Sequence, residues 1–300
     1  MLFFCLASQM WNFAVYLPLV IGELVPECDE EWECFLLLLE ILQICVSSVF
    51  SADLVEYLAF LIEMYLSSFC ECYPHKNILP KQHYLTHFPS QILKLGPLTT
   101  SWCMRMEAKN SYFKRIDQQG NFKNIALSVA RRHQKLMCAL LHDNDFFDKA
   151  MNKSIAQCES SLSAEPNWTK EPLENFLVAH NLQQTTVTRV DWIEMQGNKY
   201  CVDDVIWVGF EDELPKFGKI YGIILMMSHM FFTLNLYITK GTDHHHNSFL
   251  VQKSAKFILK QVTEDSVWMG KQHSLETHQL SSCEPGTFHI VTKYFISNLV

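Results

Sequence analysis

A single carboxylate among cations is the first feature of this sequence that could do chemistry. Glu107 stands in the segment 74–142, which holds eleven Lys and Arg residues and only one other acid, Asp117. Carboxylate oxygens bind Mg²⁺ and related divalent ions, and a metal held beside bases can act on a phosphate backbone. The alternative is a solvated helix-surface acid that eases the repulsion among its basic neighbours. Both interpretations stay open at this point.

Two histidines precede Glu107 at helical spacing. The prolines on either side of Lys81–His87 leave room for about two helical turns, in which His83 and His87 would share one face. Two histidines four residues apart form a known zinc geometry, but the glutamate of the H-E-x-x-H motif is missing. We therefore favour a role in anchoring a backbone turn or in contacting nucleic acid. The run His244–His246 is a weaker metal candidate, because three consecutive side chains point in different directions.

Charge is distributed unevenly along the chain. Residues 1–73 carry eleven acids and no Lys or Arg, so their net charge is −11, whereas residues 74–142 carry +9 and the remainder −6. Such a split favours either an acidic part that neutralises a basic part or a basic surface that binds a polyanion. We interpret the acids between Glu23 and Glu33 as a solvated or docking edge rather than as catalytic groups.

Helical periodicity dominates the acidic part. It predicts a helix over Ser8–Leu24, interrupted or restarted at Pro18. A second, almost wholly apolar helix is predicted over Trp32–Phe50, with Asp29 as its N-cap, and Ser51 caps a third. These helices are expected to form an all-helical unit with a buried core.

Two further helices are expected to carry the cations. Trp102–Ile116 is predicted to be helical, with Glu107 and Lys114 on the same polar side, two turns apart. After a turn at Gly120-Asn121, an amphipathic helix follows over Phe122–Leu140. The basic side of an amphipathic helix is usually only exposed to solvent. Together with the preceding cations, however, it could bind successive phosphates of a nucleic-acid backbone.

The pattern changes after this basic part, and the chain as a whole is expected to be α+β. We expect a helical segment over residues 1–145, a linker over 146–186 with a short helix near Leu173–His180, and a small all-β SH3-like barrel over 187–300. The barrel is expected to hold five or six short strands, with a hairpin turn at Gly197-Asn198 and a loop at Glu211–Pro215. The predicted strands are Tyr200–Val208, Lys216–Met226, Met230–Thr239, Phe257–Val262 and Thr287–Ile296.

Cysteine usage and hydropathy argue against a secreted or membrane protein. The eleven cysteines show no framework spacing and no C-x-x-C pair, which indicates reduced thiols and no zinc site in a nuclear or cytoplasmic protein. Met1–Ala7 is a short apolar run, and it lacks the basic residues with which a secretory signal peptide begins. Cys34–Phe50 is apolar but short and contains Glu40 and Gln43, which favours a buried helix over a membrane span.

The basic segment resembles a segment that recurs in transposases of the CACTA (En/Spm) type and in animal proteins derived from them. Residues 8–72 also resemble the helical part that precedes this segment in the family, and residues 195–240 resemble its β tail. The likeness therefore covers most of the chain, with its most distinctive motifs in the middle. The matching pieces are Leu79-Pro-Lys-Gln-His83, Tyr84-Leu-Thr-His-Phe-Pro89, Leu95-Gly-Pro-Leu98, Trp102-Cys-Met-Arg-Met-Glu-Ala-Lys109, Tyr112-Phe-Lys-Arg115, Asn121-Phe-Lys-Asn124 and Arg132-His-Gln134.

The resemblance implies part of a ribonuclease-H-like core, in which three carboxylates hold two Mg²⁺ or Mn²⁺ ions. Glu107 would be the third carboxylate and metal ligand, and His83 would match a histidine between the second and third acids. Pro80 departs from the family, which often has Cys or Asp at this position. The first two acids are expected before the helical part, so we expect a truncated chain without nuclease activity of its own and without a resident cofactor.

The leading hypothesis is therefore a catalytically incomplete, transposase-derived protein that binds DNA. One alternative is an active metal-dependent nuclease completed by other acids, such as Asp53 or Asp143. Another is a protein-interaction scaffold without a nucleic-acid role, whose partner binds residues 187–300. The sequence indicates no small-molecule substrate and no membrane partner. The candidate DNA contacts are Lys81, His83, His87, Arg105, Lys109, Lys114, Arg115, Lys123, Arg131 and Arg132.

Overall fold

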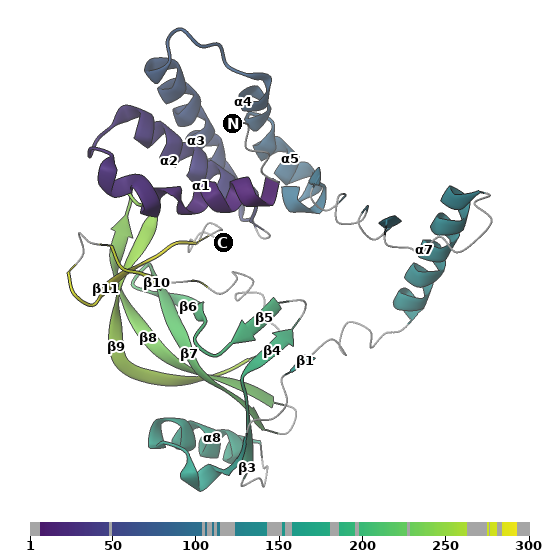
Figure 1. Ribbon diagram of the computed structural model, residues 1–300, viewed down its shortest axis with the longest axis vertical. Coiled ribbons are helices and arrows are strands. Elements are labelled where there is room, and N and C mark those ends of the chain that lie inside the picture. Colours follow the sequence, from purple (N-terminus) through teal and green to yellow (C-terminus); the bar gives the residue numbers. More distant parts are fainter. Residues whose placement is uncertain are drawn as a thin grey trace.

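The protein is an α+β chain, as the sequence predicts, with helices of the first half packed on one end of an antiparallel sheet of the second half (Figure 1). A computed structural model describes residues 7–47, 50–103, 106, 110, 113–114, 124–142, 152–153, 158–180, 186–195, 198–226, 229–262, 275, 277–280 and 284–292.

The helical part begins with three helices. The first continues through Pro18, so the predicted interruption is wrong. A proline inside a helix loses one backbone hydrogen bond, and the packing of the fully buried Val15 against Leu39 and Val291 offsets that loss. The elements are α1 (Ala7–Ile21), the 3-10 turn η1 (Gly22–Leu24), α2 (Glu30–Cys45) and α3 (Ala52–Cys72).

Both predicted N-caps are confirmed. The backbone N–H of Trp32 donates to Asp29 Oδ1 at 2.8 Å, and the N–H of Leu54 donates to Ser51 Oγ at 3.1 Å. Each bond satisfies one of the amides that a helix leaves unpaired in its first turn. Helix α2 starts two residues earlier than predicted, at Glu30, because the capping residue fixes the start.

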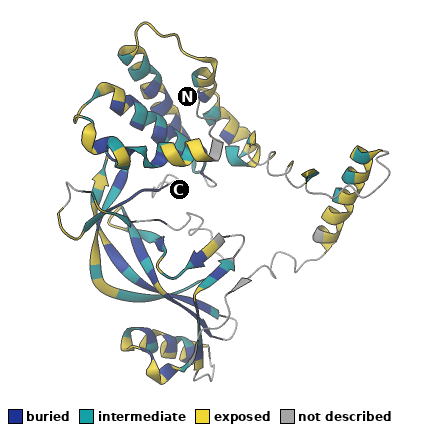
Figure 2. Cartoon of the chain, viewed as in Figure 1, coloured by how far each residue is buried: buried dark blue, intermediate teal, exposed yellow. Residues whose placement is uncertain are grey.

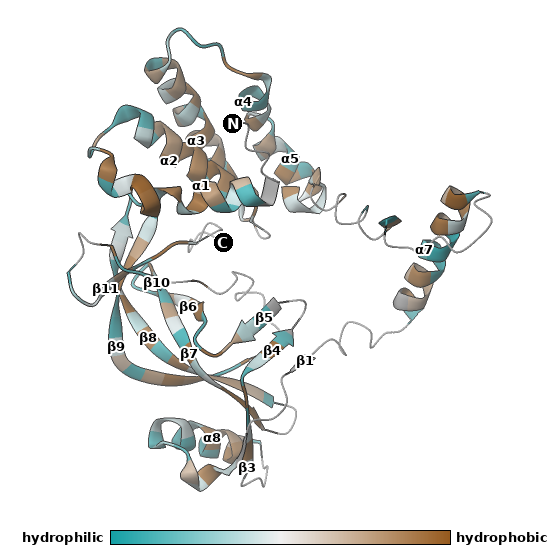
Figure 3. Ribbon diagram, in the orientation of Figure 1, coloured by the Kyte–Doolittle hydropathy of each residue, from teal (hydrophilic) through white to brown (hydrophobic). Residues whose placement is uncertain are grey.

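Helices α2 and α3 pack face to face around the core of the helical part. Ile41 and Ile44 of α2 and Leu54 and Leu58 of α3 are fully buried. Burying one such side chain stabilises a fold by about 1.5–3 kcal/mol. Both helices are strongly apolar (Figure 3), yet no described helix is long and apolar enough to cross a membrane.

Two short helices lie against α3, and a longer one stands apart. Figure 1 shows α7 away from both the helical part and the sheet. Asn124, with a positive φ of 51°, directly precedes α7. The bounds are α4 (Pro80–Leu85), α5 (Phe88–Leu95), the 3-10 turn η2 (Leu98–Thr100) and α7 (Ile125–His142).

The β part is an eight-stranded antiparallel sheet beside a small three-stranded one. The large sheet has the order β10-β11-β9-β8-β7-β3-β2, with β6 also paired to β7, and the small one has the order β1-β4-β5. The strands are β1 (Asn152–Lys153), β2 (Cys158–Ser161), β3 (Thr186–Val190), β4 (Trp192–Met195), β5 (Asn198–Cys201), β6 (Val205–Glu211), β7 (Leu214–Met226), β8 (His229–Asp243), β9 (Ser248–Gln261), β10 (Thr277–His278) and β11 (Thr287–Ile290).

The central strands are longer than the short strands expected from sequence. β7, β8 and β9 contain 13, 15 and 14 residues. β8 runs to Asp243, four residues beyond the predicted end at Thr239, because its pairing with β9 resumes after a register shift between Thr239 and Gly241. Such bulges bend and twist a strand without ending it. The loop expected at Glu211–Pro215 is only a two-residue turn, in which Asp212 and Glu213 both have positive φ.

The segment expected as a linker contributes to the β part. β2 pairs with β3, the 3-10 turn η3 (Leu162–Ala164) follows it, and the predicted short helix is present as α8 (Asn167–Ala179). Leu173 and Leu177 of α8 are buried against Ile224 and Phe231 of the sheet. Residues 158–180 therefore add an edge strand, β2, to the sheet and cover one of its faces with α8.

The helical part and the sheet are in direct contact. Trp32 Nε1 donates to the carbonyl of His245 at 3.0 Å, and Gln43 Nε2 donates to the carbonyl of Thr292 at 2.7 Å. Gln43 is 4% exposed, so its hydrogen bond is made inside the protein, where an unpaired amide would be costly. These contacts position the helices on the end of the sheet where β8 turns into β9.

Candidate nucleic-acid interface

The predicted site residues divide into two groups. About half lie outside the described residues, including the expected catalytic and metal-binding carboxylate. Those outside are Arg105, Glu107, Lys109, Arg115 and Lys123. The described ones are all exposed, as binding to a polyanion requires: Lys81, His83, His87, Lys114, Arg131 and Arg132.

Helices α4 and α5 present the first of these residues because their opposite sides are held by α3. Leu85 and Ile92 are buried in the core of the helical part. Gln82 Nε2 donates to the hydroxyl of Tyr65 at 3.0 Å, which fixes the rotation of α4. Because these residues hold α4 and α5 against α3, the side chain of Lys81 is exposed to solvent on the other side of α4.

His83 and His87 lie together, but not on one helix as predicted, because α4 ends at Leu85 and His87 directly precedes α5. Their ring centroids are 5.0 Å apart and the rings are perpendicular. The backbone carbonyls of both residues accept hydrogen bonds. The Thr86 hydroxyl donates to His83 O at 2.7 Å, and the Ser90 hydroxyl donates to His87 O at 2.9 Å. The pair therefore sits at the turn between α4 and α5 with both rings accessible.

Helix α7 separates a basic side from an apolar side. Arg131, Arg132 and Lys135 are exposed on one side, and none forms an ion pair with a described residue. On the apolar side His133 contacts Phe113 edge to face, with centroids 5.4 Å apart. Figure 2 shows most of α7 exposed. Lys135 was not among the candidate contacts, although its spacing of four from Arg131 places both on one face.

The cations of α4 and those of α7 are not brought together. Figure 1 shows α7 at the far right, well apart from α4 in the upper middle of the molecule. Each is a separate basic surface, and a polyanion that touched both would have to follow an extended path. The backbone of DNA, with one charge for about every 1.7 Å of duplex, is such an extended polyanion.

The described residues hold no metal centre. Within them, no three His, Cys, Asp or Glu side chains come close enough to bind one ion. Asp53, an alternative ligand, is exposed in the first turn of α3. Asp143, the other alternative, lies outside the described residues.

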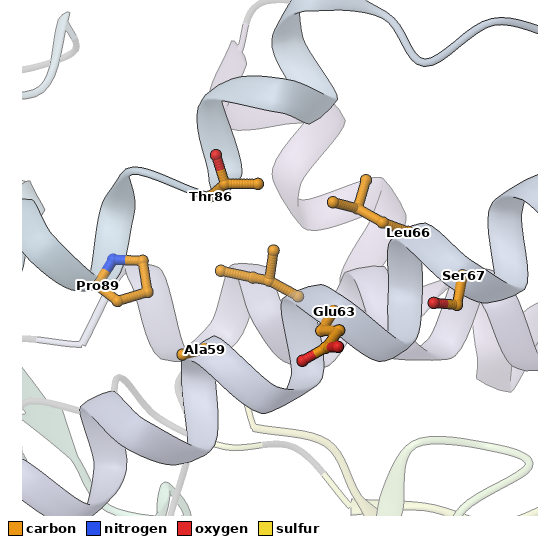
Figure 4. A pocket seen from close by; sticks show the side chains of 7 residues that line it. Ala59, Glu63, Leu66, Ser67, Thr86 and Pro89 are labelled. Carbon is orange, nitrogen blue, oxygen red and sulfur yellow. The ribbon is translucent and has the colours of Figure 1, made fainter.

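A shallow pocket of about 290 Å³ lies between α3 and the turn joining α4 to α5 (Figure 4). Its walls are mainly apolar, and Glu63 is the one charged residue among the described residues that line it. A carboxylate in this position repels phosphate, so the pocket is not part of a phosphate-binding surface. The lining residues are Ala59, Ile62, Glu63, Leu66, Ser67, Thr86 and Pro89.

The acidic helices do not neutralise the basic segment within the described structure. Of the ion pairs between described residues, none joins an acid of residues 7–73 to a base of residues 74–142. The basic side chains of α4 and α7 therefore keep their charge available to an external anion.

Comparison with models of protein families, with curated proteins and with solved structures gives no match to this chain.

Proposed function

We propose that this chain is a transposase-derived protein that binds DNA through its basic segment and lacks a complete catalytic centre. The observation that carries the proposal is helix α7, whose Arg131, Arg132 and Lys135 are exposed side by side. A row of unpaired cations on one helix face is the arrangement that contacts successive phosphates. Lys81, His83 and His87 add a second exposed group on α4 and at the turn before α5.

The family resemblance supplies the finer fold assignment in this proposal. The helical part would correspond to the helical portion of a ribonuclease-H-like core, and the β part to a small barrel of SH3-like type. Glu107 would be the remaining carboxylate of the metal site, and Mg²⁺ or Mn²⁺ would bind only if other acids completed that site. A DNA-binding role would place the protein in the nucleus.

The proposal is tested by measuring binding of the whole chain to fluorescent duplex DNA by anisotropy at several salt concentrations. We expect affinity to fall steeply between 50 and 200 mM salt, because each phosphate contact releases a counterion and adds about 0.9 to the slope. The double variant Arg131→Gln, Arg132→Gln should bind more weakly and reduce that slope by roughly two.

A matched control removes the same charge from the β part. Lys240 and Lys256 are exposed on β8 and β9, so Lys240→Gln, Lys256→Gln should leave the slope unchanged. Equal losses in the two double variants would mean that net charge, and not α7, determines binding. Binding that is absent or independent of salt would reject the proposal and favour a protein-interaction scaffold.

A further inference from the structure

A cluster of ionisable side chains occupies the contact between the helical part and the sheet. It is separate from the basic segment and has no role in the proposed DNA binding. β8, the turn after it, β10, β11 and η1 each contribute one group. The cluster consists of Glu23, Asp243, His246, His278 and His289.

Asp243 holds His246 in a fixed orientation. The carboxylate accepts the backbone N–H of His246 at 3.1 Å, and its second oxygen lies 2.9 Å from Nδ1 of the same ring. The opposite nitrogen, Nε2, is buried without a hydrogen-bond partner among the described residues. A Cβ added to Gly22 would lie 2.6 Å from the His246 ring, so the ring rests directly on the backbone of η1.

His289 lies deeper in the same cluster. It is 1% exposed, and its Nδ1 lies 2.7 Å from Ser248 Oγ and 3.9 Å from the Asp243 carboxylate. Its ring centroid is 5.4 Å from that of His246, and His278 is its direct partner across β10 and β11. Burial lowers the pKa of His289, Asp243 and Glu23 oppose that shift, and His246 and His278 add to it.

We propose that this cluster is a pH-sensitive latch, which holds the helices on the sheet at neutral pH and releases them when His289 is protonated. A charged His289 would be almost fully buried, and the Asp243 carboxylate 3.9 Å away is already contacted by the backbone N–H and the ring of His246. Separation of η1 from the sheet exposes the unpaired nitrogen of His246 to water. The groups that face His289 and His246 from the packed elements are Glu23, Asp243, His245 and His278. Tyr16 of α1 contacts the His278 ring, with centroids 5.8 Å apart.

The direction follows from proton linkage. Burial holds the pKa of His289 below its ordinary value while the contact is closed, so the open form takes up more protons in acid. The latch is therefore fully closed above the ordinary histidine range and loosens as the pH falls through it. Each proton taken up only on opening changes the closed-to-open ratio by up to about tenfold per pH unit.

Trp32 reports on the latch directly. Its indole donates to the carbonyl of His245 and its ring lies 5.8 Å from the His245 ring, so opening changes its surroundings. The fluorescence of the whole chain, minus that of a Trp32→Phe variant, is measured between pH 7.5 and 5.5. We expect a reversible change with a midpoint in the histidine range while the far-ultraviolet circular dichroism stays constant. A constant Trp32 signal, or a change only together with the circular dichroism, overturns the proposal.

Substitutions then identify the groups that titrate. His289→Asn keeps a polar partner for Ser248 but cannot be protonated, so the midpoint should move to lower pH. Gly22→Ala presses on the His246 ring, which weakens the closed form at every pH and should move the midpoint upward. His180→Asn, at the residue that follows α8 and away from the cluster, should leave the midpoint unchanged. A midpoint that is the same in all three variants rejects the latch.

Discussion

Helices α3 and α7 are similar in length and both carry an apolar stripe, yet they meet different surroundings. Leu58 of α3 is fully buried among neighbours from α2, whereas Leu136 of α7 is 39% exposed. Ser51 caps α3 through its side chain, and Asn124 precedes α7 with positive φ. An apolar stripe therefore shows which face of a helix can be buried. Whether that face is buried depends on packing partners from other segments of the chain.

The largest difference between the buried core shared by α2 and α3 and the exposed helix α7 is expected in thiol reactivity. Burial raises the pKa of Cys45 on α2 to about 12, whereas Cys138 on α7 is exposed. Because the thiolate is the reactive form, Cys138 should be alkylated at pH 8 at least about a hundredfold faster than Cys45. Peptide mass spectrometry after timed labelling measures both rates. In urea the two rates should converge, and equal rates in the native protein would contradict the buried position of α2.

The next largest difference is expected in the free energy of unfolding. Leu58→Ala leaves a cavity in the core of the helical part and should cost about 2–5 kcal/mol. Leu136→Ala on α7 is the matched control and should stay within about 0.5 kcal/mol, since alanine also favours a helix. Urea denaturation followed by circular dichroism measures both. A similar loss in the two variants would show that the apolar side of α7 is covered in solution.

The smallest effect concerns the start of α3. Ser51→Ala removes the oxygen that accepts the Leu54 N–H and should lower the free energy of unfolding by about 1 kcal/mol. Ser67→Ala, at an exposed position within the same helix, should have little effect or a slightly favourable one. The difference between the two serine variants, measured in urea, isolates the cap. No difference would mean that packing alone fixes the start of α3.

Local signals in the sequence predicted the helical part well. Asp29 and Ser51 are N-caps because their oxygen reaches an amide three residues ahead, which is a short-range interaction. The rings of His83 and His87 are close together, but across the turn after α4 and not on one helix as predicted. Pro18 misled the prediction because the contacts of Val15 that stabilise α1 come from distant parts of the chain.

Long-range pairing limited the prediction of the β part. The first half of β9 was missed because its exposed Lys253 and Lys256 resemble a loop, and its strand character comes from pairing with β8. The ionisable cluster was missed for the same reason, since His289 meets Ser248 only after β11 pairs with β9. The sequence shows the run from Asp243 to His246, but it does not show that Gly22 and His289 contact this run in the fold.

The small apolar cluster of Val15, Leu39 and Val291 has a consequence for the order of events during synthesis. Its members come from the first helix and from one of the last described residues, so the contact spans nearly the whole described chain. Helices α2 and α3 can pack on each other early, because they are neighbours in sequence and local contacts form fastest. α1 can pack on Leu39 of α2 early, but the cluster is complete only after Val291 has emerged from the ribosome. Until then the part of the cluster that Val291 covers is open to chaperones and to other nascent chains.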